Sequence, residues 1–134
     1  MSKVIRAGMA ALVAATIAGG VASASTPAFA SGGGGGIEVM GRCSGASTST
    51  LKAKPDNGRL EVEFQVDSNV VGQTWGVLLK DNGTTFFKGT ATTTAPSGSF
   101  EVRKFTANQA GTDKIQASAR NPQTGETCVA QLSI

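Results

Sequence analysis

Apolar and polar residues alternate in several short segments of the chain, most clearly over residues 59–67. Leu60, Val62, Phe64 and Val66 take every second position there, and charged or amide side chains fill the positions between them. Successive side chains of a β-strand point to opposite faces of the sheet. The pattern therefore predicts a strand with one buried face and one face in water.

The same alternation predicts further strands on both sides of this segment. Ile37, Val39 and Cys43 are expected to share the first of them. Other inward positions are predicted at Leu51, Ala53, Trp75, Val77, Leu79, Phe100, Val102, Ile115, Ala117, Ala119, Cys128, Ala130, Leu132 and Ile134. Asn-Gly pairs at 57–58 and 82–83 predict tight hairpins, because this pair tolerates positive φ.

These strands are short and regularly spaced, and no segment after residue 36 has helical spacing of apolar residues. About seven or eight such strands favour a sandwich or barrel. We expect an all-β fold, a single immunoglobulin-like β-sandwich of short antiparallel strands over residues 37–134. Trp75 on a central strand is consistent with it, and a small barrel is the main alternative.

The first thirty residues have the layout of a secretory signal peptide. Lys3 and Arg6 precede an apolar stretch at 7–21, and Ala28-Phe29-Ala30 offers small residues at the two positions that a signal peptidase recognises. The stretch is short and contains glycines, which disfavours a membrane span. We expect cleavage after Ala30, a flexible Gly-rich leader at 31–36, and a product that is secreted, either extracellular or loosely associated with the cell wall, with no membrane contact.

Loss of the signal peptide changes the charge balance. The chain has 12 basic and 9 acidic residues, and removal of Lys3 and Arg6 leaves 10 basic against 9 acidic. The basic residues are interleaved with acids along the chain. This order predicts a mixed-charge surface and no nucleic-acid partner, since nucleic-acid binding needs a clustered basic face.

The two cysteines are expected to form a disulfide. Exported proteins meet an oxidising environment, and both Cys43 and Cys128 share phase with inward residues of their strands. The bridge would join the first strand of the domain to the last.

The residues available for chemistry exclude most enzyme classes. The chain has no His and no Tyr, which removes the commonest general bases and the ordinary zinc ligands. Glu61 and Glu63 are expected on the outer face of their strand as solvated charges, and Asp81-Asn82-Gly83-Thr84 is explained by a hairpin turn. We therefore expect no catalytic residue, no metal site and no cofactor.

One hairpin carries apolar residues on both faces. If the turn after residue 80 takes three residues, Leu78 lies opposite Phe86 on the outer face, and Val129 of the last strand faces the same way. These three residues are the candidate partner surface. A two-residue turn would bury Phe86 instead, so the prediction depends on register.

Four segments resemble a family of small secreted actinobacterial proteins with two cysteines and an immunoglobulin-like sandwich. They are LKAKPDNGRLEVEF at 51–64, GSFEVRK at 98–104, AGTDKI at 110–115 and TGETC at 124–128. The resemblance implies secretion and the two-cysteine sandwich, and it implies no activity. The sequence thus favours a non-catalytic extracellular module that binds a protein or a cell-wall polymer. A secreted hydrolase inhibitor or a small-molecule carrier is the alternative.

Overall fold

The computed structural model describes residues 35–134, which form nine β-strands and no helix. The predicted signal peptide at 1–30 and most of the predicted leader at 31–36 lie outside the described residues. The strands are β1 (Ile37–Met40), β2 (Arg42–Cys43), β3 (Thr48–Asp56), β4 (Arg59–Asp67), β5 (Thr74–Asp81), β6 (Thr84–Thr92), β7 (Ser99–Ala107), β8 (Lys114–Arg120) and β9 (Thr127–Ser133). No helix among these residues could cross a membrane.

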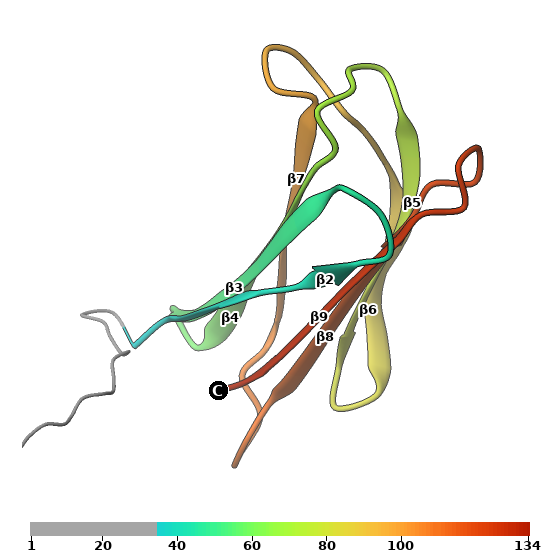
Figure 1. The fold of residues 1–134 in the computed structure, drawn as a ribbon. Coiled ribbons are helices and arrows are strands. Elements are labelled where there is room, and N and C mark those ends of the chain that lie inside the picture. The colour runs from blue at the N-terminus through green and yellow to red at the C-terminus, as the bar shows by residue number, and fades with distance from the viewer. Residues whose placement is uncertain (1–34) are drawn as a thin grey trace, which may run out of the picture. The chain divides into compact units, whose positions relative to one another are not determined.

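The strands form two antiparallel sheets that enclose one core (Figure 1). One sheet has four strands in the order β1-β3-β4-β7, and the other has five in the order β2-β9-β8-β5-β6. The predicted all-β class is confirmed. The structure has nine strands where about seven or eight were predicted, partly because the first predicted strand is divided between the sheets.

This division is the main correction to the predicted strands. Ile37 and Val39 lie on β1 beside β3, whereas Cys43 lies on β2 beside β9. The chain crosses between the sheets at Gly41, where a Cβ atom would clash with the Ser49 hydroxyl and lie 2.6 Å from the carbonyl oxygen of Val129. Only glycine fits this approach, and the inward and outward alternation continues through it while the chain changes sheet.

The core takes the apolar positions of both sheets. The predicted inward residues of 59–67 are all buried, and Trp75 and Leu79 of β5 are fully buried opposite them. The Trp75 ring lies 6.2 Å from the ring of Phe100, centroid to centroid. Burial of this apolar face on both sheets is the main driving force for the fold.

Both predicted Asn-Gly turns are present. Asn57 and Gly58 have φ of 52° and 80°, and Asn82 and Gly83 have φ of 50° and 85°. Positive φ at both central residues fits the right-handed twist of the flanking strands, which is why two-residue turns join β3 to β4 and β5 to β6.

Candidate binding face of the five-stranded sheet

The two cysteines form the predicted disulfide, between neighbouring strands of one sheet. The sulfur atoms of Cys43 and Cys128 are 2.10 Å apart, and the two residues are directly opposite each other on β2 and β9. Glu126 also lies near both sulfurs, but disulfide sulfurs are not the thiolates that bind metals. Its carboxylate accepts hydrogen bonds from the N–H of Gly45 at 3.1 Å and of Ser47 at 2.9 Å. This group of residues fastens the N-terminal segment to β9.

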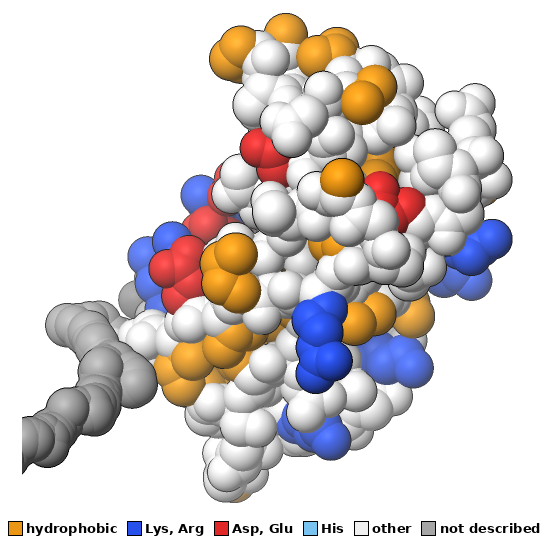
Figure 2. All heavy atoms as spheres, in the orientation of Figure 1, with side chains coloured by type: hydrophobic (Ala, Val, Ile, Leu, Met, Phe, Trp, Pro, Cys, Tyr) orange, Lys and Arg blue, Asp and Glu red, His pale blue; other side chains and the backbone are white. Residues whose placement is uncertain are grey.

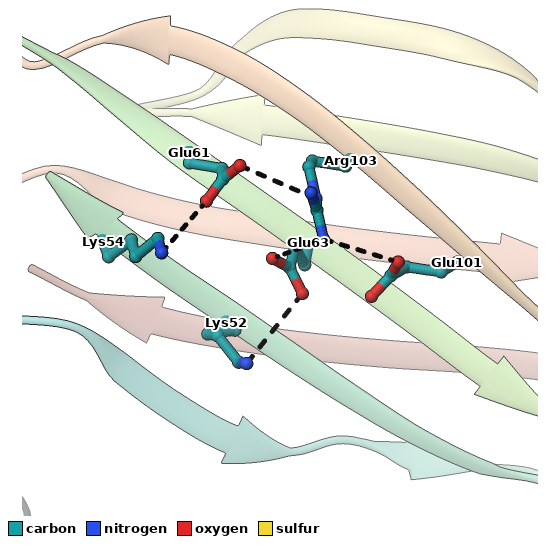
Figure 3. A network of polar contacts seen from close by, with 6 residues as sticks. All are labelled: Lys52, Lys54, Glu61, Glu63, Glu101 and Arg103. Carbon is teal, nitrogen blue, oxygen red and sulfur yellow. Dashed lines mark ion pairs between the residues drawn. The ribbon is translucent and has the colours of Figure 1, made fainter. Parts of the chain in front are cut away.

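The outer face of the four-stranded sheet is covered by cross-strand ion pairs (Figure 3). Arg103 of β7 lies between two glutamates of β4, with its Nε 3.6 Å from Glu61 Oε2 and an Nη atom 3.2 Å from Glu63 Oε2. Each glutamate also pairs with a lysine of β3. The network consists of Lys52, Lys54, Glu61, Glu63, Glu101 and Arg103. Glu61 and Glu63 face outward as predicted, but their basic partners cover them, so that only 11% and 15% of these side chains is exposed.

The outer face of the five-stranded sheet is positively charged. It is formed by the residues that alternate with the buried ones on β5, β8 and β9 and by their partners on β2 and β6. Five basic residues point outward from it: Arg42, Lys80, Lys88, Lys114 and Arg120. None of the described Asp and Glu residues lies on this face. The space-filling view shows basic and apolar side chains over β9, β8 and β6 with no acidic side chain between them (Figure 2).

This segregation corrects the predicted mixed-charge surface. In the chain, Lys80 is followed by Asp81 and Asp113 by Lys114. Neighbouring residues of an extended segment face opposite sides of the sheet, so both lysines point outward and both aspartates are buried. The mixed-charge prediction holds for the four-stranded sheet and is wrong for the five-stranded one.

A single row of residues crosses the five strands of this face. Cross-strand pairing places Lys88, Leu78, Ser118, Val129 and Arg42 side by side on β6, β5, β8, β9 and β2. Neighbouring strands are about 4.8 Å apart, so the two basic ends of the row are about 19 Å from each other. We call this set the cross-strand row.

Two shallow hollows adjoin along the cross-strand row. One, of about 460 Å³, lies over β2, β9, β8 and β5, and its lining includes Met40, Lys80 and Val129. The other, of about 370 Å³, lies towards β6 and includes Gly89 and Arg120. Leu78 and Ser118 line both hollows. The centre of the face is therefore hollowed, with the apolar side chains of Leu78 and Val129 beside the polar Ser118, and basic side chains lie around it.

The predicted partner surface is divided by a β-bulge. The turn of the β5–β6 hairpin has two residues, not three, and the register then shifts so that Leu79 pairs with Phe87 and Leu78 pairs with Lys88. Phe86, the residue skipped in this pairing, is half-buried and packs against the core. Leu78 and Val129 do share the outer face, and Val129 is 49% exposed. Whether a partner binds them stays a prediction.

A pair of buried carboxyl groups lies at one end of the core. Asp81 at the end of β5 is 2% exposed, and Asp113 just before β8 is fully buried. The Thr106 hydroxyl donates to Asp81 Oδ2 at 3.2 Å, and the Gln109 N–H donates to Asp113 Oδ2 at 3.2 Å. The pKa of Asp81 is raised from 3.8 to about 6. Burial is the largest cause, and the hydrogen bond and charge of Asp113 raise it further.

Exposed apolar residues also occur at the tip of the β4–β5 loop. Val70 and Val71 are 49% and 55% exposed. The loop is fixed by Thr93, whose hydroxyl donates to the Val70 carbonyl and accepts from the Gln73 N–H at 2.9 Å. The tip is apolar and is anchored by these hydrogen bonds, but unlike the cross-strand row it has no basic residue within it.

Sequence reasoning found Leu78 and Val129 but missed the basic residues around them. Alternation on β5 could have placed Lys80 beside Leu78, and the phase of β8 could have placed Arg120 on an outer face. The position of Arg42 could not be inferred, because it depends on the change of sheet at Gly41. Comparison with protein-family models, with curated proteins and with solved structures finds no match to this chain.

Proposed function

We propose that this chain is an exported, non-catalytic binding domain that holds an extracellular partner on the outer face of its five-stranded sheet. The observation that carries the proposal is the charge of that face. It has five outward basic residues around a hollow that Leu78 and Val129 line, and none of them forms an ion pair with a described residue. On the opposite face, Lys52, Lys54 and Arg103 are paired with glutamates.

We also propose that the two sheets form an immunoglobulin-like sandwich, and the strand order supports it. Constant-type immunoglobulin domains order their strands A-B-E-D in one sheet and C-F-G in the other. With β3, β4 and β7 as A, B and E, and β5, β8 and β9 as C, F and G, the two sheets follow these orders, with no strand D. Trp75 then takes the buried position on strand C where such domains carry a Trp. The Cys43–Cys128 disulfide differs, because it lies within one sheet and does not join the two.

Export is supported by the signal-peptide layout of the first thirty residues and by the disulfide, since disulfides persist in oxidising compartments. The lack of catalysis is supported by the absence of His and Tyr from the sequence and by the state of the acidic residues. Glu61 and Glu63 are held in ion pairs, and Asp81 and Asp113 are buried away from any substrate.

The alternative is a secreted hydrolase inhibitor, with a small-molecule carrier as its variant. The apolar tip at Val70 and Val71 favours the inhibitor, because a fixed, exposed loop can enter the cleft of an enzyme with little loss of entropy.

Binding to envelope material separates the two functions. The protein is incubated with purified cell walls and, separately, with a panel of secreted hydrolases at equimolar amounts. We expect retention on the envelope fraction, lost on replacing Arg42 and Lys88 by Gln and kept when Lys52 and Lys54 are replaced instead. The second variant is matched in the charge removed. Stoichiometric inhibition of one hydrolase, lost in Val71→Ser, would favour the alternative, and retention unaffected by the first variant would overturn the proposed face.

A further inference from the structure

We propose that the occupant of the cross-strand row is an extended, acidic segment of a partner protein with aliphatic residues at its centre. This inference rests on the proposed function and names the chemistry of the partner. It follows from the order of side chains along the row, which is basic at both ends, with Leu78 and Val129 between them.

Charge selects an anionic partner. Arg42 and Lys88 close the two ends of the row. Lys80 on β5 and Arg120 on β8 lie two residues from it along their strands, on opposite sides. Each can reach a carboxylate placed over the row, and arginine can bind a carboxylate through two parallel hydrogen bonds. Among the described residues no acidic side chain on this face opposes such a partner, so the partner would meet attraction from every side.

The apolar centre selects a polypeptide among anionic partners. Val129 is 49% exposed, and it lines the same hollow as Leu78 and Met40. A polyanionic glycan would bind the basic residues around the cross-strand row and leave Leu78, Val129 and Met40 exposed to water. Single-stranded nucleic acid usually stacks its bases on aromatic side chains, and the outward positions of this face carry none. Aliphatic side chains of a peptide would fill the hollow and remove the surface from water.

The geometry of an extended chain fits the length of the row. The two basic ends are about 19 Å apart, and six residues of extended chain span about 20 Å. Side chains at alternate positions face the same way. A segment with acids at its first and seventh residues and aliphatic residues at its third and fifth would therefore place two carboxylates and two apolar side chains on the row. The small Ser118 at the middle leaves room for its backbone.

The test is a titration of the ¹⁵N-labelled protein, followed by amide chemical shifts, with the peptide Glu-Asp-Leu-Ser-Val-Asp-Glu. We expect saturable shifts on the five strands around the cross-strand row, which weaken as salt is raised. Replacing Leu and Val of the peptide by Ser, or its acids by Asn and Gln, should each weaken binding about tenfold or more. Sulfated dextran and a thymidine oligonucleotide serve as the probes for the other anionic classes.

Matched variants locate the site. Arg42→Gln with Lys88→Gln should weaken peptide binding about tenfold, and Lys52→Gln with Lys54→Gln should change it less than about twofold. Val129→Ser should weaken it, whereas Val70→Ser should not, although both valines are 49% exposed. Thermal melting of each variant separates a lost contact from a lost fold.

Three outcomes would overturn the inference: no shifts with the peptide, equal affinity for the peptide without aliphatic residues, or tighter binding of the dextran or the oligonucleotide. Its failure is distinguishable from that of the proposed function. If cell walls retain the protein through Arg42 and Lys88 while the peptide does not bind, the binding face stands and only the identity of the partner is wrong.

Discussion

Replacing Asp81 by Asn should stabilise the protein at neutral pH, although it removes a buried native side chain. Asp81 and Asp113 are 2% and 0% exposed, and burial together with the neighbouring carboxyl group raises the pKa of Asp81 to about 6. Above that pH Asp81 carries a negative charge in a buried place beside the carboxyl group of Asp113. The amide of an Asn at this position has nearly the same shape as the carboxyl group. Its oxygen still accepts the hydrogen bond from the Thr106 hydroxyl, and its N–H can donate a hydrogen bond to Asp113.

The magnitude follows from the raised pKa. A shift of one pKa unit corresponds to 1.36 kcal/mol, so a rise from 3.8 to about 6 amounts to about 3 kcal/mol. Between these two values the folded protein holds a proton that the unfolded chain has lost. Stability from this group is therefore present below about pH 4, falls as the pH rises to about 6, and stays low above that. Asp81→Asn has no such group to titrate.

The assay is guanidinium unfolding at pH values from 4 to 8, followed by the fluorescence of Trp75, which is the only Trp in the sequence and is fully buried. We expect Asp81→Asn to exceed the wild type by up to about 3 kcal/mol at pH 7 to 8, and by less than about 1 kcal/mol at pH 4. Asp56→Asn, which removes a carboxylate at the end of β3, is the control. A variant that is no more stable than the wild type at pH 7.5, or a difference that does not change with pH, would refute the reasoning.

Three further predictions concern the disulfide, the change of sheet at Gly41 and the signal peptide. Replacing Cys43 and Cys128 by Ala should cost about 2–5 kcal/mol in the unfolding assay, and thiol labelling of the denatured, unreduced wild type should find no free thiol. Gly41→Ala should cost about 1–3 kcal/mol, because the added Cβ would lie 2.6 Å from the Val129 carbonyl; an unchanged melting temperature would contradict this. Intact mass of the secreted protein should correspond to a chain that begins at Ser31, and a product that retains residues 12–17 would contradict the signal peptide.

Much of the fold could be predicted because each sheet has one face in the core and the other face in contact with water. Strict alternation at 59–67 identified the four buried residues of β4, and the Asn-Gly pairs identified two hairpins. Their physical basis is local: side-chain direction in a strand and positive φ in a turn. The disulfide could be predicted because both cysteines share phase with the inward residues of their strands and because the protein is expected to be exported.

The features that escaped prediction depend on tertiary contacts. The change of sheet at Gly41 exists because the backbone of β9 approaches that residue, and nothing in the local pattern shows it. The bulge that places Phe86 against the core is also set by packing. It lets Leu79 and Phe87 pair on the inner face despite a two-residue turn, a combination that counting turn residues alone does not give.

The charge of the five-stranded sheet could not be predicted for a related reason, which also explains the buried carboxyl pair. When charges are counted along the sequence, the adjacent charges of Lys80 and Asp81 cancel. Those of Asp113 and Lys114 cancel in the same way. In the extended segments that these residues occupy, one member of each couple faces outward and the other is buried. If both aspartates were on the outer face, two carboxylates would lie among the five basic residues. The raised pKa of Asp81 and the unopposed positive charge of the five-stranded sheet are therefore two consequences of the same strand phase.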